Sequence, residues 1–188
     1  MGAVIAEGCD KRLVDKQDCC LLIIDVQERL FQLISDKERI RDNIVRLIRF
    51  SKIMDLPIIL TEQENLGETI PEIRVEMEDV APVMKMDFNC FRSPGFAGRI
   101  KDTGKKVLIV AGIETHICVA QTAIYALSGY GVQLLTDCTS SRARDDRDIA
   151  LKRMAGCGVT LTTCEMFFYE LLKKAGTDKF REVLKLVK

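Results

Sequence analysis

Three residues whose types suit hydrolytic chemistry stand where short apolar runs end. Asp25 follows the run CCLLII, Lys85 ends a short extended piece at 83–85, and Cys118 lies in GIETHIC, a turn that leads into a helix. A cysteine at a helix N-terminus meets free N–H groups and the positive end of the helix dipole, which favour the nucleophilic thiolate. Asp25 is suited to take the thiol proton, and Lys85 to hold that carboxylate. The three residues therefore form a candidate nucleophile, base and orienting cation.

Each of these residues also has a structural interpretation. Buried cysteines are commonly inert, aspartates often cap turns, and lysines are usually solvated. His116 is a tempting partner for Cys118, but it lies only two residues earlier on a tight turn, which favours a structural role. Glu114 in the same turn is interpreted as a surface or interface carboxylate.

The elements that must position these residues alternate between two kinds. Continuous apolar runs at 20–24, 57–60, 107–111, 132–135 and 159–161 are typical of strands covered on both faces, and segments with helical spacing separate them. This order predicts an α/β fold: a three-layer αβα sandwich with a mainly parallel, doubly wound sheet. We expect one domain over residues 1–188, with residues 1–17 as a loose N-terminal extension. Ligands of such sheets bind outside the carboxyl ends of the strands, where the three residues are expected to meet.

The charge balance argues against polyanionic partners. The 188 residues include 28 Lys+Arg and 28 Asp+Glu, so no net charge attracts nucleic acid or an anionic membrane. No apolar run approaches a membrane span and the N-terminus lacks a signal-peptide core, so we expect a cytoplasmic protein with a small-molecule substrate. The eight cysteines are then expected to be thiols, and with a single histidine we expect no metal.

Four blocks of sequence resemble the isochorismatase-like cysteine hydrolases. They are LLIIDVQERLF, VMKMDFNCF, VLIVAGIETHICVAQTA and LLTDCTSSRARDDRDIALKRMAGCGVTLTTCEMFFYELL. The resemblance runs from about Cys20 to the end of the chain and is strongest to the short, metal-free subgroup of isochorismatase-domain-containing proteins. It implies the isochorismatase-like hydrolase fold, with Asp25 as general base, Lys85 as the triad lysine and Cys118 as nucleophile.

The resemblance also implies how the substrate is held. It implies a cis peptide bond between Ile113 and Glu114, which turns the Glu114 N–H beside the Cys118 N–H to form an oxyanion hole. It further implies a substrate pocket lined by Gln27, Gln63, Phe88 and Asn89.

Two departures within the family refine the predicted reaction. Metal-dependent nicotinamidases carry histidines after the second strand, where this chain reads TEQENLGET, so we expect neither a metal nor another cofactor. True isochorismatases usually lack the cysteine and cleave a vinyl ether. Cys118 therefore favours hydrolysis of a small carboxamide or N-carbamoyl substrate through a thioester acyl-enzyme.

Three alternative functions remain open. The chain could be a vinyl-ether hydrolase, a non-catalytic binding or scaffold protein, or a nucleic-acid enzyme; the absence of net charge and of a stacking aromatic cluster disfavours the last. Similar proteins are oligomers, and Phe167, Phe168 and Tyr169 look exposed in the sequence. We therefore expect a homo-oligomer, a dimer or larger.

Overall fold

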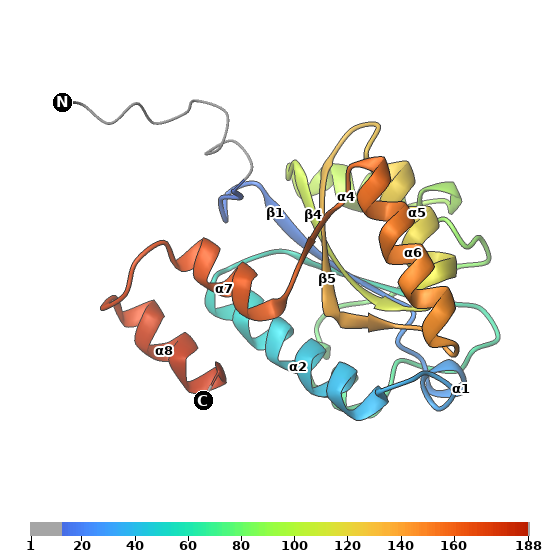
Figure 1. Cartoon of the computed structure of the whole chain (residues 1–188), viewed down its shortest axis with the longest axis horizontal. Helices are drawn as coiled ribbons and strands as arrows, with labels where there is room; N and C mark the ends of the chain where they lie inside the picture. Colours follow the sequence, from blue (N-terminus) through green and yellow to red (C-terminus); the bar gives the residue numbers. More distant parts are fainter. Residues whose placement is uncertain (1–12, 188) are drawn as a thin grey trace.

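A computed structural model describes residues 13–187 and contains a six-stranded parallel sheet of order β3-β2-β1-β4-β5-β6 (Figure 1). The chain begins at the centre of the sheet, builds outward to β3, returns to β4 and builds outward the other way. The predicted doubly wound parallel topology is confirmed. The strands are β1 (Cys19–Ile24), β2 (Ile58–Gln63), β3 (Val83–Lys85), β4 (Val107–Ile113), β5 (Gly131–Ser140) and β6 (Thr160–Thr162).

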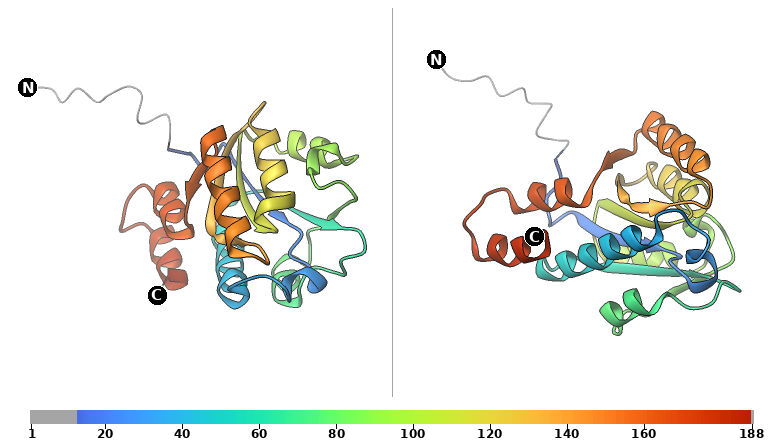
Figure 2. Two further views of the ribbon diagram at one scale, coloured as in Figure 1. Left: turned by 45° about the vertical axis from the view of Figure 1, so that its right-hand side comes forward. Right: turned by 60° about the horizontal axis from the view of Figure 1, so that its bottom comes forward.

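Helices cover both faces of the sheet and make the three layers (Figure 2). One layer holds α1 (Glu28–Phe31), α2 (Lys37–Ile53), α3 (Pro71–Arg74), α7 (Cys164–Leu172) and α8 (Asp178–Val187). The other holds α4 (Phe96–Asp102), α5 (Ala120–Ala126) and α6 (Arg144–Cys157). Short turns η2 (Val75–Met77) and η3 (Cys90–Arg92) and the π-helix η4 (Thr115–Val119) complete the elements of the described residues.

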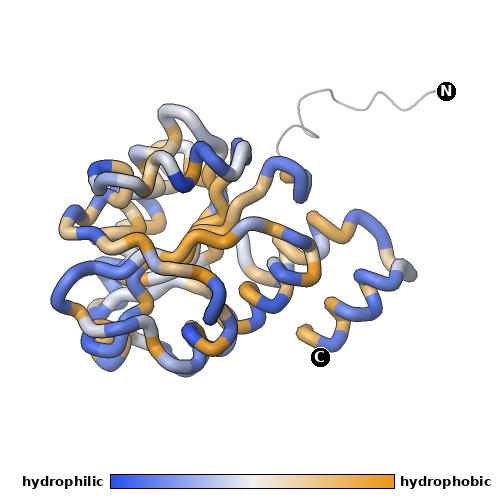
Figure 3. The backbone as a smooth tube through the Cα atoms, turned by 180° about the vertical axis from the view of Figure 1, so that it is seen from behind, coloured by the Kyte–Doolittle hydropathy of each residue, from blue (hydrophilic) through white to orange (hydrophobic). Residues whose placement is uncertain are grey.

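The position of β1 at the centre of the sheet explains why its sequence is apolar without alternation. Cys19, Leu21 and Ile23 point into the core beneath α2, whereas Cys20, Leu22 and Ile24 point into the core beneath α5. All six side chains are fully buried. The hydrophobic strands accordingly run through the middle of the molecule in Figure 3. A strand covered on both faces must be apolar at every position, which is the pattern that predicted it.

Of the three aromatic residues expected to be exposed, Phe167 and Phe168 lie in the core, so the expectation is wrong for these two and holds for Tyr169. Phe167 and Phe168 of α7 are both fully buried. The Phe168 ring stacks on Phe50 of α2 with ring centroids 4.0 Å apart. Tyr169 is 43% exposed and meets the ring of Phe180 in α8. Phe167 and Phe168 therefore face inward because α2 and α8 pack against α7, which periodicity alone could not show.

Part of the predicted N-terminal extension is attached to the fold. Residues 1–12 lie outside the described region. After them, the Val14 N–H donates a hydrogen bond to the Glu170 carboxylate, and Asp15 forms an ion pair with Lys173. Among residues 13–187, no helix combines the length and the apolar character that a membrane crossing requires.

Candidate active site

The structure brings Asp25, Lys85 and Cys118 together at the carboxyl edge of the sheet. Asp25 directly follows β1, Lys85 ends β3, and Cys118 lies in η4 just after β4. The Lys85 Nζ is 2.6 Å from Asp25 Oδ2 and 3.7 Å from Cys118 Sγ. All three residues are buried, with Cys118 the most exposed at 6%. Lys85 therefore links the two other side chains within a site that is almost free of solvent.

Asp25 is held by its neighbour on β2. Parallel pairing sets Ile24 opposite Thr61, and Asp25 N donates to Thr61 O at 3.2 Å. The Thr61 hydroxyl donates to Asp25 Oδ1 at 2.7 Å. Asp25 adopts φ 51°, a left-handed conformation that aspartate tolerates better than most residues. The sequence analysis assigned no role to Thr61; the available signal was a hydroxyl at the end of an otherwise apolar strand.

Lys85 is fixed by several acceptors. In addition to Asp25, its ammonium donates to Gln63 Oε1 at 2.7 Å and to the Asp87 carbonyl at 3.2 Å. Burial lowers the pKa of Lys85, but the charges of Asp25 and of a Cys118 thiolate, with the hydrogen bond to Asp25, raise this pKa above its ordinary value overall. Lys85 is therefore a permanent buried cation whose position the surrounding oxygens determine.

Cys118 rests as a thiol. Burial raises the pKa of Cys118 most, the negative charge of Asp25 raises it further, and Lys85 lowers it only in part. Lys85 thus favours the thiolate, as expected, but desolvation is the larger effect and the pKa of Cys118 stays raised. A nucleophilic role for Cys118 therefore requires a neighbouring base that removes the thiol proton.

The turn between β4 and η4 contains a cis peptide bond, between Ile113 and Glu114. Glu114 is only 3% exposed, so its interpretation as a surface carboxylate is wrong. Its Oε1 accepts hydrogen bonds from the backbone N and the Nε of Arg142, both at 3.0 Å. Arg142 was not predicted from the sequence, because it stands among other arginines in SSRARDDR and its neighbours there do not distinguish it.

The end of β5 supports the same turn. The Thr139 hydroxyl lies 2.8 Å from the Gly112 carbonyl and 2.8 Å from the Thr115 hydroxyl. His116 Nδ1 lies 2.9 Å from the Ser141 hydroxyl, which gives the ring a structural partner. Gly112 has φ 127°, and a Cβ there would fall 2.2 Å from the Ile24 carbonyl. Only glycine therefore lets β4 approach β1 beside Asp25.

The amides of Gln27 and Gln63 are engaged with the protein. Gln27 is fully buried; its Nε2 donates to the carbonyls of Gln63 at 2.9 Å and Gly67 at 2.6 Å, and its Oε1 accepts from Gln63 N at 2.8 Å. The Gln63 side chain accepts from Lys85 and donates to the Met86 carbonyl at 2.7 Å. These contacts position the end of β2 and Lys85, and they occupy the amide groups that were expected to line the substrate pocket.

The two other predicted pocket residues differ in exposure. Phe88 is 54% exposed, whereas Asn89 is 6% exposed and lines a cleft of about 380 Å³. The triad itself does not line this cleft. Another cleft, of about 300 Å³ beside Met54 and Leu172, holds none of the predicted site residues. The polar residues around the larger cleft are Asn89, Arg92, His116, Gln121, Tyr125 and Arg153.

The family model of the isochorismatase domain matches residues 19–166, a span that contains Asp25, Lys85 and Cys118. This chain belongs to the isochorismatase family. Isochorismatase domain-containing protein 2A of Mus musculus is 32% identical over 172 residues, covering 89% of this chain and 82% of the mouse protein. The isochorismatase fold and family predicted from the sequence are confirmed.

Solved structures of family relatives superpose closely. The MAR1 ribonuclease of Caenorhabditis elegans has a TM-score of 0.87 and 32% identity, covering 93% of this chain and 92% of its own. YcaC from Pseudomonas aeruginosa, described with hexane-2,5-diol and covalent acrylamide, has a TM-score of 0.87 and 28% identity, covering 93% and 91%. YcaC from Escherichia coli, described as an octameric hydrolase of unknown specificity, has a TM-score of 0.84 and 28% identity, covering 94% and 87%.

Proposed function

We propose that this isochorismatase-family chain is a cysteine hydrolase that cleaves a small carboxamide or N-carbamoyl substrate. The observation that carries the proposal is the position of the Lys85 ammonium, 2.6 Å from Asp25 and 3.7 Å from Cys118 inside a buried site. A buried lysine between a carboxylate and a thiol has a clear chemical use. It stabilises negative charge on whichever of the two carries it as a proton passes between them.

The proposed reaction proceeds through a thioester. Asp25 accepts the thiol proton as the Cys118 sulfur attacks the substrate carbonyl, and Lys85 stabilises the charge on sulfur. Collapse of the tetrahedral intermediate breaks the C–N bond, and the protonated Asp25 gives its proton to the leaving amine. Water then attacks the thioester with Asp25 as base, which releases the acid and restores the thiol. The raised pKa of Cys118 is compatible with this scheme because the thiol needs a base only during attack.

We further propose that the backbone N–H groups of Glu114 and Cys118 bind the oxyanion. Cys118 lies in η4, directly after the cis peptide bond between Ile113 and Glu114, so the two N–H groups belong to one tight turn. Glu114 is held from the side by Arg142, and Thr115 by Thr139. These contacts keep the turn rigid, as an oxyanion hole requires.

The substrate should be small and polar. Asp25, Lys85 and Cys118 are all buried, so the space beside them admits only a small molecule. The acrylamide described as covalent in the YcaC structure of Pseudomonas aeruginosa supports a nucleophile that reacts with a small electrophile in that relative. None of the proposed steps requires a cofactor.

The deciding experiment screens primary amides and N-carbamoyl compounds for ammonia release and then compares variants on the best substrate. Cys118→Ala and Asp25→Asn should each abolish turnover, because nucleophile and base act as one unit. Cys157→Ala, which removes an exposed thiol, is the matched control and should retain full activity. No ammonia release from any compound, or full turnover by Cys118→Ala, would refute the proposal.

The same variants separate the alternatives. A vinyl-ether hydrolase forms no acyl-enzyme, so Asp25→Asn would be severe while Cys118→Ala would retain much activity. A binding or scaffold protein would show no turnover, and Cys118 would fail to react with small electrophiles. We predict no nucleic-acid partner; because one relative is named a ribonuclease, RNA cleavage by the same preparation is the check. Activity that chelators remove and zinc restores would overturn all of these mechanisms.

We propose a homo-oligomer in the cytoplasm. The described octamer of Escherichia coli YcaC supports assembly. In this chain Met84, Met86 and Phe88 are each more than half exposed along and just after the edge strand β3. An exposed apolar edge strand favours pairing with another copy. Light scattering that shows a monomer at micromolar concentration would refute the assembly.

A further inference from the structure

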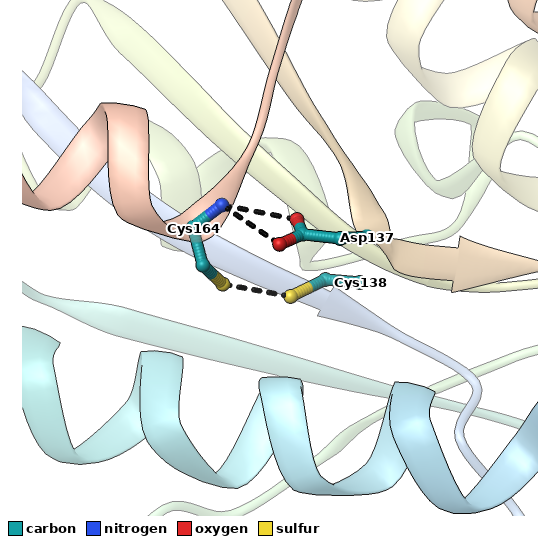
Figure 4. A group of neighbouring side chains, drawn as sticks. All are labelled: Asp137, Cys138 and Cys164. Carbon is teal, nitrogen blue, oxygen red and sulfur yellow. Dashed lines mark hydrogen bonds between the residues drawn. The ribbon is translucent and has the colours of Figure 1, made fainter. Parts of the chain in front are cut away.

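A pair of buried thiols lies away from the proposed catalytic residues, between β5 and the start of α7 (Figure 4). The Cys138 and Cys164 sulfurs are 3.1 Å apart, although the residues are 26 positions apart in the chain. Cys138 is fully buried and Cys164 is 2% exposed. The Cys164 sulfur also contacts the Asn43 carbonyl of α2 at 3.7 Å. Three elements therefore enclose two sulfurs that nearly touch.

A metal site is the first alternative, because Asp137 adds a third donor whose oxygen lies within 4.8 Å of both sulfurs. However, Cys164 N donates to both carboxylate oxygens of Asp137, at 3.0 and 3.2 Å. Asp137 thus caps the N-terminus of α7. Structural zinc sites use four ligands, and the described residues bring together only these three candidates here. The geometry favours chemistry between the two sulfurs.

We propose that Cys138 and Cys164 form a reversible redox modification site, in which a peroxide oxidises the two thiols to a disulfide that ties β5 to α7. In the first step the Cys164 sulfur attacks a peroxide oxygen; the O–O bond breaks, a sulfenic acid forms and water leaves. The Cys138 sulfur then attacks the Cys164 sulfur, the S–O bond breaks and a second water leaves. The two thiols lose two electrons and two protons, and hydrogen peroxide is reduced to two waters. A dithiol reductant reverses the change.

The order of the steps follows from the surroundings of the two sulfurs. Cys164 is the first residue of α7 and, at 2% exposed, is the less deeply buried of the two cysteines. Cys138 is inside the core, and burial, with its hydrogen bond to Cys164, raises the pKa of its thiol well above the ordinary value. Cys164 is therefore the attacking sulfur and Cys138 the resolving one. The close contact makes the second step faster than escape of the sulfenic acid to further oxidation.

The disulfide should have a thermal signature. A bond across 26 positions restricts the unfolded chain, and loop-closure entropy for that length corresponds to an increase in melting temperature of roughly 10 °C for a domain of this size. The increase should disappear after treatment with dithiothreitol.

The test treats the full-length protein with hydrogen peroxide and maps the disulfide by mass spectrometry. The background is Cys157→Ser, because trypsin leaves Cys157 and Cys164 in one peptide, residues 154–173. Trypsin also leaves Cys118 and Cys138 together in residues 107–142, so a second cleavage before Asp137 separates them. We expect one cross-link, between Cys138 and Cys164, accompanied by the increase in melting temperature. In the same background, Cys164→Ser should remove both the cross-link and the increase in melting temperature. Cys138→Ser should have the same two effects.

Several outcomes would overturn the proposal. They are a cross-link between other cysteines, sulfinic acid at Cys164 without a cross-link, no oxidation of the pair while other thiols react, and a melting temperature that does not rise. Stoichiometric zinc held by the reduced protein and lost in Cys164→Ser would replace the redox site with a metal site.

Discussion

The ion pair between Lys85 and Asp25 makes a quantitative prediction about stability. Both side chains are fully buried, and Lys85→Met keeps most of the side-chain volume while it removes the charge. The variant leaves the Asp25 carboxylate buried without a counter-ion. Removing one partner of a buried pair costs about 3–5 kcal/mol. For a domain of this size that corresponds to a fall in melting temperature of roughly 6–20 °C.

The double variant isolates the charge effect. Asp25→Asn keeps an oxygen that accepts the Thr61 hydroxyl, and asparagine tolerates the left-handed conformation at position 25. The hydrogen bond from Lys85 to Gln63 is lost in both Lys85→Met and Asp25→Asn/Lys85→Met, so its contribution cancels between them. The double variant should therefore be more stable than Lys85→Met by at least about 2 kcal/mol, although it carries more substitutions.

Urea unfolding followed by circular dichroism gives the free energies of unfolding, and the slopes show whether the variants remain two-state. The matched control is Arg49→Met, which removes an ion pair to Glu76 whose arginine is 54% exposed and should cost at most about 1 kcal/mol. Equal stability of Lys85→Met and the double variant would refute the reasoning. So would an equally large effect of Arg49→Met.

Three further predictions concern the frame around the site. Gly112→Ala should prevent folding, since its Cβ would overlap the Ile24 backbone. Gly156→Ala in α6 meets open space and should stabilise the folded protein by about 0.5–1 kcal/mol. Expression levels and thermal melts of the two variants test this. Thr61→Val should destabilise the protein by about 1.5–3 kcal/mol and lower turnover, while Thr61→Ser should retain most of the stability and most of the turnover. Equal losses of stability and turnover in the two variants would contradict the role of the hydroxyl. Alkaline pH should unfold the protein. Burial is the main cause that raises the pKa of several thiols. The folded state therefore keeps protons that the unfolded state releases above about pH 9. Each such thiol lowers the free energy of unfolding by about 1.4 kcal/mol per pH unit between that pH and its folded pKa. The effect is expected from Cys19 and Cys20, with pKa values of about 12, and from Cys90, with a pKa of about 11. A melting temperature that stays constant from pH 8 to 11 under reducing conditions would exclude it.

The sequence by itself determined the sheet and the edge at which the triad lies. The runs around Leu21 and Ile109 are almost entirely apolar because both faces of a parallel sheet are covered, so their strands were predictable within a few residues, whereas β5 continues five residues beyond its predicted run. The carboxyl ends of parallel strands share one edge, which is why Asp25 and Lys85 could be placed together before any contact was known.

Only the tertiary structure decided the partners and the protonation of the site. Burial makes Cys118 a thiol, and desolvation depends on how many other segments cover a residue, which no local pattern records. The buried Glu114 carboxylate is paired with Arg142, which lies 28 positions later in the chain. The thiols of Cys138 and Cys164 likewise meet only because α7 packs against β5 and α2. Local spacing determines which face of an element a side chain occupies, whereas packing between distant segments determines which atoms that side chain meets.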